Sequence, residues 1–245
     1  MKAVAVIRAL GPIDLRSVAR DSMLRWLVAL PVLMALALRW GVPVAAERVS
    51  RQYAIDLLPY YPLIASIIVL VTPMVAGTVI GFLLLDQRDD RTLSALQVTP
   101  LTLPGYLAYR MAVPMLVSVV MTVITVPLTG LVQIGPLPLL LVGVAASPLA
   151  PTFALLLAAF ANNKVQGFAI MKAAGALNWP PIIAWFLPTV WQWVMGVVPT
   201  YWPVKLFWLL EAGEGGWWGY LVVGTAYQLL VVTLMLRRFN TVMHR

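Results

Sequence analysis

Long apolar stretches separated by short groups of charged residues run along the whole chain. Residues 57–85, 111–163 and 173–204 contain no Asp, Glu, Lys or Arg. A charged side chain at the centre of a membrane helix costs about 2.5–3.5 kcal/mol on insertion scales, and a spanning helix needs about 20 mostly apolar residues. The charges therefore mark the ends of predicted membrane spans.

This pattern predicts six spans. The stretch 111–163 is too long for one helix, and Gly130, Gly135 and Pro136 mark a turn that divides it into two. The charged pair Arg237 and Arg238 ends the last span. The expected spans are about 22–40, 60–85, 107–130, 138–161, 167–187 and 217–236.

Prolines interrupt the segment between the fifth and sixth spans. Pro188, Pro199 and Pro203 fall within an uncharged stretch that is longer than one span requires. We expect irregular or re-entrant structure here. Such backbone survives at membrane depth only where protein or water satisfies its polar groups, so the segment should pack against the other helices.

The N-terminal residues 1–21 have a different character. Arg8, Arg16 and Arg20 recur among apolar residues, and Gly11 and Pro12 predict a bend. This pattern is typical of an amphipathic helix that lies in the cytoplasmic interface of the membrane.

Composition supports one transmembrane domain over residues 1–245. The chain has 62% hydrophobic and 11% charged residues and a mean hydropathy of +0.91, far from the composition of soluble domains. The fold class is therefore an all-α integral membrane protein. The net charge of +8 suits cytoplasmic loops beside anionic membrane lipid better than nucleic acid.

Basic residues also predict the orientation. With six spans, thirteen Lys and Arg residues lie on the side of the termini, and four lie on the other side. The positive-inside rule then places both termini in the cytoplasm. The four on the outer side are Arg39, Arg48, Arg51 and Lys205.

Several catalytic chemistries lack their residues. No lysine precedes Ser or Thr as a phosphate-binding loop requires, the one histidine is the penultimate His244, and cysteine is absent. We expect no catalytic residue, no metal site and no cofactor bound by this chain. A channel, a passive scaffold or a subunit driven by another protein remain as classes.

The loop between the second and third spans carries the strongest signal. Residues 86–101 read DQRDDRTLSALQVTPL, with five charges within six residues. Asp89 and Asp90 favour the start of a short helix, and Thr99-Pro100 ends it. A helix of this length is unstable alone in water and needs a docking surface. We therefore expect a short cytoplasmic coupling helix that forms the docking surface for a soluble partner protein that drives movement.

This loop resembles the signature of ABC-2 type permeases, the membrane subunits of type V ATP-binding cassette transporters. The matching positions are Arg88, Asp89, Thr92, Leu93, Leu96, Thr99 and Pro100. Arg91 stands where the family usually has glycine, and Gln87 stands at an acidic position. Together with YLAYR at 106–110, the loop is most similar to the branch of fluoroquinolone-export permeases.

The resemblance implies an ATP-driven exporter of an amphipathic drug or lipid across the cytoplasmic membrane. It implies two copies of a separate ATP-binding subunit, which carries ATP and magnesium, and a second permease, identical or homologous. The residues implied in coupling to that subunit are Arg88, Asp89, Asp90, Arg91, Thr92, Leu93, Leu96, Thr99 and Pro100.

Two glycines one helical turn apart in the second span form a pair of small residues, and several alternative functions also stay open. Gly77 and Gly81 allow close helix packing, within the subunit or at a dimer interface. An uptake-system membrane subunit is the nearest rival, although Ala29 and Ala35 form no regular docking face. A membrane-embedded enzyme is a further alternative, but the candidate aspartates around Asp86 are interleaved with arginine and lie outside the spans. A structural or chaperone-like membrane protein also stays open.

Overall fold

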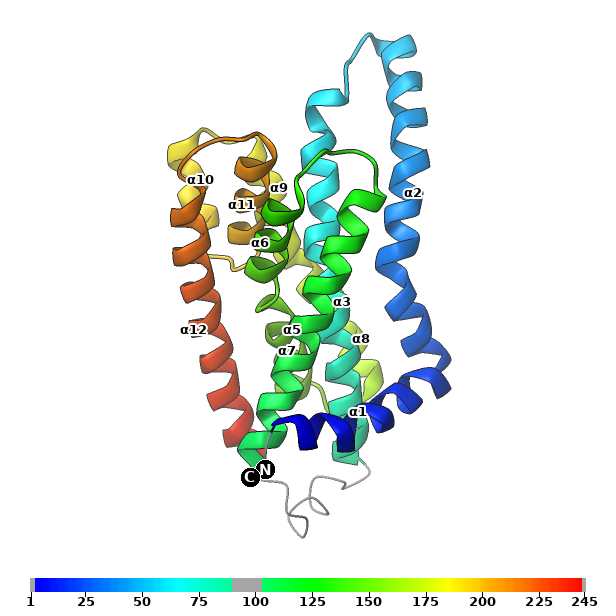
Figure 1. The fold of residues 1–245 in the computed structure, drawn as a ribbon, viewed down its shortest axis with the longest axis vertical. Coiled ribbons are helices and arrows are strands. Elements are labelled where there is room, and N and C mark those ends of the chain that lie inside the picture. The colour runs from blue at the N-terminus through cyan, green and yellow to red at the C-terminus, as the bar shows by residue number, and fades with distance from the viewer. Residues whose placement is uncertain (1–2, 90–102, 244–245) are drawn as a thin grey trace.

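The computed structural model describes residues 3–89 and 103–243, and every regular element in these ranges is helical. The helices form an elongated bundle, with both termini at one end and α1 lying across that end (Figure 1). The elements are α1 (Ala3–Arg20), α2 (Ser22–Tyr53), η1 (Leu58–Tyr60), α3 (Tyr61–Asp89), α5 (Leu103–Leu128), α6 (Pro136–Ala146), α7 (Leu149–Phe160), α8 (Lys164–Ala174), η2 (Gly175–Asn178), α9 (Trp179–Trp185), α10 (Thr189–Met195), α11 (Tyr201–Glu211) and α12 (Trp217–Met243).

Five helical segments of the described chain are long and apolar enough to cross a membrane. They are Ser22–Tyr53, Leu58–Gln87, Gly105–Leu128, Pro136–Phe160 and Trp217–Phe239. These segments overlap the first four expected spans and the last one. Helix α2 continues well beyond the expected end at residue 40. Its extension carries charged residues, including an i,i+4 pair between Glu47 and Arg51, and it ends at Ala54, which adopts a left-handed conformation with φ 54°.

The range 167–187 differs from the single helix expected there. It consists of α8, the 3₁₀ turn η2 and the short helix α9. Pro180 and Pro181 occupy the first turn of α9, where proline is tolerated because the first N–H groups of a helix have no intrahelical acceptor. Prolines at these positions start a new helix and cannot continue α8, so this range is not among the five long segments.

A break in the fourth long segment separates α6 from α7. Pro148 has no N–H, so the carbonyl of Val144 loses its usual helical donor. The Ser147 Oγ hydroxyl donates to that carbonyl at 2.9 Å. The next carbonyl, that of Ala145, accepts from Gln228 Nε2 of α12 at 3.0 Å. The break is therefore satisfied internally, as membrane depth requires.

Helix α3 forms the centre of the bundle. In the most apolar stretch of α3, 83% of the residues are buried. The corresponding shares in α2 and α12 are only 11% and 17%, so these two helices lie at the edges. Gly77 and Gly81 face α7 of the same chain. An added Cβ at Gly77 would lie 2.1 Å from the Ala150 carbonyl oxygen, and one at Gly81 would lie 2.6 Å from Leu157 Cδ1. Glycine thus permits the closest helix contact in the core.

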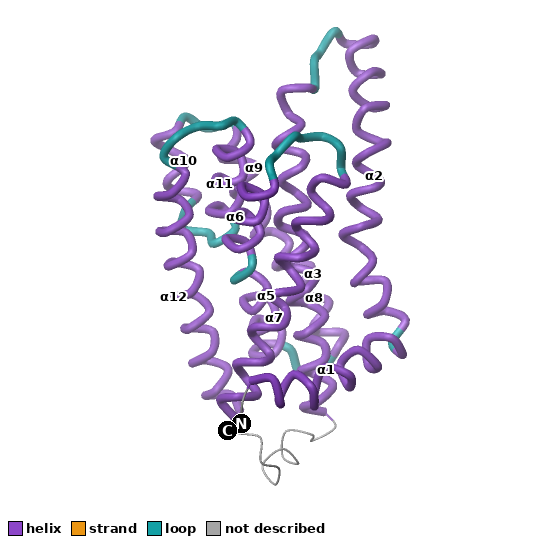
Figure 2. Tube along the Cα trace, viewed as in Figure 1, coloured by secondary structure: helices purple, strands orange, loops and turns teal. Residues whose placement is uncertain are grey.

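Helices α10 and α11 form a hairpin whose turn lies part-way along the bundle and not at its end (Figure 2). Side chains satisfy the carbonyls of this turn. Trp202 Nε1 donates to Gly196 O at 2.9 Å, and Tyr227 Oη donates to Val197 O at 2.5 Å. Thr200 Oγ1 donates to Leu177 O in η2. The irregular backbone expected between the last two spans is thereby packed against η2 and α12.

Candidate functional site

The predicted coupling loop begins at the end of α3. Arg88 and Asp89 are the last residues of that helix. Asp90, Arg91, Thr92, Leu93, Leu96, Thr99 and Pro100 lie outside the described residues. The described flanks, α3 before the loop and α5 after it, are held by two polar clusters at the end of the bundle where the termini lie.

The first cluster centres on a buried ion pair between α1 and α5. Arg110 Nη1 lies 2.8 Å from Asp14 Oδ2, and their side chains are 0% and 12% exposed. The Tyr109 hydroxyl donates to the same carboxylate oxygen at 2.9 Å. A buried pair offsets its desolvation only with good geometry and added hydrogen bonds. The Tyr109 hydroxyl supplies one such bond to Asp14, whereas Arg110 Nη2 has no hydrogen-bond partner among the described residues.

Hydrogen bonds extend this cluster to α3. Arg110 Nε donates to Tyr106 Oη at 3.1 Å, and the Tyr106 hydroxyl donates to Gln87 Oε1 at 2.5 Å. The guanidinium carbon also lies 5.2 Å from the centre of the Tyr106 ring and 5.6 Å from that of Tyr109, within cation–π range. We call Asp14, Gln87, Tyr106, Tyr109 and Arg110 the Asp14–Arg110 network.

The second cluster is formed by Lys164 at the start of α8. Its Nζ lies 3.2 Å from Asp21 Oδ2 and 3.0 Å from Asp86 Oδ1. Asp21 is also the N-cap of α2, since its Oδ1 accepts from the N–H groups of Met23 and Leu24. We call Asp21, Asp86 and Lys164 the Lys164 bridge. It ties the α1–α2 junction and α8 to α3, one residue before Gln87.

The electrostatics of the Lys164 bridge favour its charged form. Burial alone raises the pKa of Asp21, but the hydrogen bonds from Lys164 and from the α2 backbone outweigh it, so the pKa lies below its usual 3.8. Burial likewise lowers the pKa of Lys164, and hydrogen bonds to Asp86 and Asp21 reverse that effect and raise it above 10.5. Asp21 and Lys164 are therefore both charged at neutral pH.

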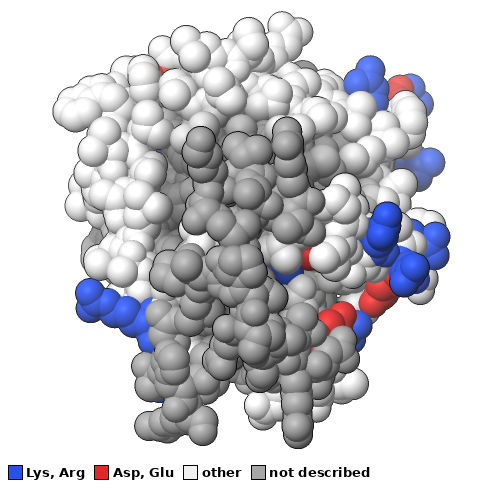
Figure 3. Space-filling view, turned by 60° about the horizontal axis from the view of Figure 1, so that its bottom comes forward, with Lys and Arg blue, Asp and Glu red and all other residues white. Residues whose placement is uncertain are grey.

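Basic side chains gather along one side of the described surface at this end of the molecule, with a few acidic groups among them (Figure 3). Arg16, Arg20 and Arg25, around the α1–α2 junction, are exposed. None of the three takes part in an ion pair with another side chain of residues 10–87 and 105–239. They are available to anionic lipid headgroups.

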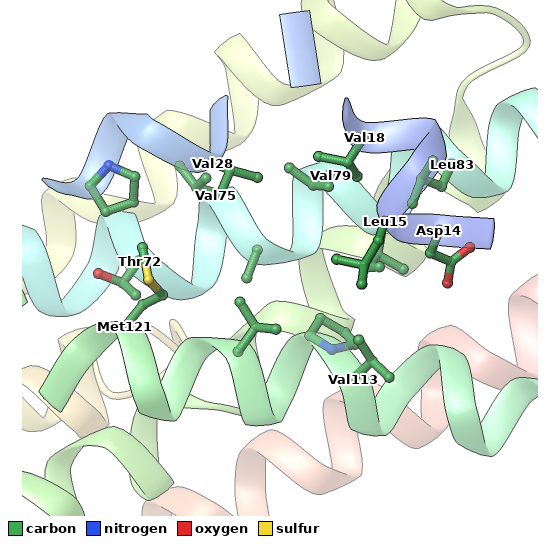
Figure 4. Close-up of a pocket in the computed structure, with 15 residues that line it drawn as sticks. Asp14, Leu15, Val18, Val28, Thr72, Val75, Val79, Leu83, Val113 and Met121 are labelled. Carbon is green, nitrogen blue, oxygen red and sulfur yellow. The ribbon is translucent and has the colours of Figure 1, made fainter. Parts of the chain in front are cut away.

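A mostly apolar cavity of about 220 Å³ lies directly above the Asp14–Arg110 network. Side chains from α1, α2, α3 and α5 face this space, and Asp14 lies at one end of it (Figure 4). Thr72, whose hydroxyl donates to Ile68 O at 2.8 Å, is its other polar lining residue. The network therefore lies at one end of a mostly apolar space between α1, α2, α3 and α5.

The arrangement has a mechanical rather than a catalytic character. No group of three or more His, Cys, Asp or Glu side chains within the described ranges could hold a metal ion. Instead, the two clusters fasten both flanks of the loop to α1, the α1–α2 junction and α8. The helices on either side of residues 90–102 are thus connected to α1 and α8 by side-chain contacts.

Sequence reasoning missed these two clusters. Asp14, Asp21 and Lys164 count there only as charges, and Arg110 also as part of the YLAYR motif, with no contact between them expected. The one local signal is the placement of two tyrosines beside Arg110, at i−1 and i−4, where their rings can cover the guanidinium. The acidic partner lies 96 residues away in the sequence, and a pattern of spacing does not reveal it.

Comparison with known proteins identifies the family of this chain. A family model described as "Fluoroquinolones export permease protein Rv2686c-like" matches residues 14–236, a range that contains both clusters and the loop. The chain belongs to this family. Two relatives from Mycobacterium tuberculosis strains, the fluoroquinolones export permease proteins Rv2686c and MT2760, are each 38% identical to it over 237 residues. The match covers 96% of this chain and 94% of each relative.

Membership of this permease family has direct consequences. The chain is a multi-pass membrane protein and a transporter membrane subunit, not an enzyme. The loop sequence resembles the fluoroquinolone-export branch of the permeases, and the family model identifies the same branch. The prediction of the family from residues 86–101 is therefore confirmed.

Proposed function

We propose that this permease is the membrane subunit of an ATP-driven exporter, and that force from a separate ATP-binding subunit enters through residues 88–100. The observation that carries this proposal is the fastening of both loop flanks by the Asp14–Arg110 network. Through Arg110 and Tyr106, this network connects α3, which precedes the loop, with α5, which follows it, and with α1.

The proposed topology has six crossings with both termini in the cytoplasm. In addition to the five long segments, α8, η2 and α9 together supply one further crossing, which is the fifth along the chain. Helices α10 and α11 form a re-entrant hairpin in the outer half of the membrane. Helix α1 lies in the cytoplasmic interface. The excess of basic residues on the side of the termini supports this orientation in the cytoplasmic membrane.

The proposed assembly contains two copies of the ATP-binding subunit and a second permease, identical or homologous. ATP and magnesium bind to the partner subunit, and this chain binds no cofactor. Closure of the partner on ATP displaces the coupling helix, and the two clusters carry the displacement into α1, α3, α5 and α8. Direction follows from the different affinity of ATP for the two conformations, since a ligand shifts an equilibrium only by that difference.

Within the loop, Leu93 and Leu96 seat in an apolar groove of the partner subunit. Arg88, Asp89 and Arg91 form the polar rim around them, while Thr99 and Pro100 end the helix. The i, i+3 spacing of the two leucines supports this arrangement, because it places them on one edge of a helix.

The proposed cargo is a fluoroquinolone or a similar amphipathic aromatic drug. The relatives from M. tuberculosis are named for export of this class. The mostly apolar lining of the spans is compatible with such molecules, because binding sites for drug-sized ligands are predominantly hydrophobic with a few placed polar groups.

The decisive experiment starts with extraction of the permease from its native membranes in mild detergent. The proposal expects a nucleotide-binding subunit to co-purify and to show ATPase activity. Leu96→Asp should abolish its recovery, while the matched variant Leu96→Met should retain it. A stable preparation of this chain alone, with no such subunit at any detergent concentration, would contradict the proposal and favour a channel or scaffold.

A further inference from the structure

A second cavity lies at the opposite end of the bundle from the two clusters, where α9, α10 and α11 meet the start of α3 (Figure 1). Its volume is about 240 Å³. We call it the outer cavity. It is lined by Pro62, Trp185, Gln192, Lys205, Trp208, Leu209, Glu211, Ala212 and Glu214.

Two polar atoms of this lining are buried without a partner. Gln192 Nε2 donates to Leu187 O at 2.9 Å, but Gln192 Oε1 has no hydrogen-bond partner within the described chain, and neither has Trp208 Nε1. The two residues are only 8% and 7% exposed. Nearly all buried polar atoms in proteins are hydrogen-bonded. The lining of the outer cavity therefore includes one unpaired acceptor and one unpaired donor.

Charged groups also line the outer cavity. Lys205 and Glu211 are each partly buried, and neither forms an ion pair within 4 Å among the side chains of residues 10–87 and 105–239. Glu214 at the rim of the cavity stabilises the positive charge of Lys205 electrostatically, whereas partial burial of the Glu211 carboxylate is unfavourable. Lys205, Trp208 and Leu209 follow helical i, i+3 and i+4 spacing, so they share one face of α11. The cavity thus offers a positive group beside an indole N–H, with carboxylates at its rim.

Aromatic rings form one wall. The rings of Trp185 and Trp208 lie 4.8 Å apart between centroids at an interplanar angle of 76°, and this edge-to-face pair offers a flat surface for a further ring. At the other side, Ala212 and Glu214 are exposed, so the cavity opens onto the surface and a ligand can extend beyond it.

We propose that the outer cavity binds a small aromatic zwitterion. Its carboxylate contacts the Lys205 ammonium group and accepts from Trp208 Nε1. Its protonated amine lies against Glu211 and Gln192 Oε1, and its ring packs on Trp185. The inference rests on the proposed function, under which this cavity is an exit site for cargo at the outer side of the membrane.

The test measures binding to the purified full-length permease in lipid nanodiscs by equilibrium dialysis. Two probes separate the contacts: norfloxacin carries a carboxylate and a basic piperazine amine, whereas nalidixic acid carries a carboxylate without that amine. Lys205→Met should weaken both probes about tenfold, and Glu211→Gln should weaken norfloxacin by a similar factor but leave nalidixic acid unchanged. Trp208→Phe, which keeps the ring and removes the N–H, should weaken both.

Controls make the result specific. Lys172→Met removes an exposed lysine of α8 and should leave both affinities unchanged, and each variant is checked for a wild-type elution profile and melting temperature. Unchanged binding in Lys205→Met and Glu211→Gln would overturn the proposal and assign the cavity to water alone. Equal weakening of the two probes by Glu211→Gln would also overturn it.

The proposed function is tested separately, by ATP-dependent drug uptake into inside-out vesicles that contain the partner subunit. If the vesicles take up drug in an ATP-dependent way but Lys205→Met and Glu211→Gln bind the probes as wild type does, only the outer-cavity proposal is overturned. If the variants show the expected loss of binding but the vesicles show no ATP-dependent uptake, only the proposed exporter function is overturned.

Discussion

Arg110 and Asp14 are 96 residues apart in the sequence, yet Arg110 Nη1 lies 2.8 Å from Asp14 Oδ2. This contact joins the N-terminal helix α1 to the helix that follows the coupling loop. Tyr106 and Gln87 continue the connection to the helix that precedes the loop. The loop is therefore anchored on both sides to one buried group, and α1 takes part in any movement of that group.

Removal of the arginine should be strongly destabilising. Arg110→Met leaves the Asp14 carboxylate without its counter-charge, and breaking a buried pair in this way costs about 3–5 kcal/mol. We expect a lower melting temperature in detergent and loss of ATP-dependent drug uptake. Arg16→Met is the matched control, because Arg16 is exposed, and it should behave as wild type.

The double variant Asp14→Asn/Arg110→Met separates the ion pair from the packing around it. Loss of both charges removes the uncompensated carboxylate, so the double variant should melt at a higher temperature than Arg110→Met alone. A double variant that is as unstable as the sum of the two single variants would refute the coupling between these residues.

The Lys164 bridge predicts a pH dependence. Because the pKa of Asp21 lies below its ordinary 3.8 in the folded protein, its stabilising contribution is present above pH 3.8 and is lost as the pH falls through the folded value. For Lys164, whose pKa is raised, the contribution is present below pH 10.5 and is lost as the pH rises through the folded value. The groups are partly exposed, so the effect is small.

Asp21→Asn tests this dependence, since asparagine retains the N-cap and removes the charge. Melting temperatures of the two proteins should differ at pH 7 and converge below the pKa of Asp21. A difference that stays constant from pH 7 down to pH 3 would show that the charge of Asp21 contributes nothing.

The long apolar helices were predictable because they follow local hydropathy. The expected starts at residues 22, 60 and 217 fall within a few residues of α2, α3 and α12. Hydropathy does not report where a helix ends outside the bilayer, so the extension of α2 to Tyr53 was missed. It also does not distinguish one helix from the three pieces over 167–187, which depend on Pro180 and Pro181.

Only one part of the candidate site, the coupling loop, could be predicted from the sequence. The coupling loop is a local motif, and its Thr-Leu and Thr-Pro spacing identified the family. Asp14 with Arg110 and Lys164 with Asp21 are contacts between distant segments, and they exist only after α1, α5 and α8 have packed at one end. The outer cavity was hidden for the same reason: Trp185, Gln192 and Lys205 belong to three different helices.

The contact between α3 and α7 predicts that replacement of a glycine lowers stability there but not in α12. An added Cβ at Gly77 would lie 2.1 Å from a backbone oxygen of α7, so Gly77→Ala must push the two helices apart, at about 1–3 kcal/mol. Gly219→Ala in α12 has nothing within 4 Å and should be neutral or stabilising. Thermal unfolding of the two variants side by side gives the comparison, and equal melting temperatures would contradict the close packing.

The absence of cysteine makes the proposed topology directly measurable. A single cysteine can be placed at exposed positions with no background, as Ser22→Cys, Gln52→Cys, Asn162→Cys or Ala212→Cys. With six crossings, a membrane-impermeant maleimide applied to intact cells should label positions 52 and 212 and should spare 22 and 162, which precedes α8. After permeabilisation all four should react. Labelling of 162 and 212 from the same side would mean that α8, η2 and α9 do not cross, and it would place the two termini on opposite sides of the membrane.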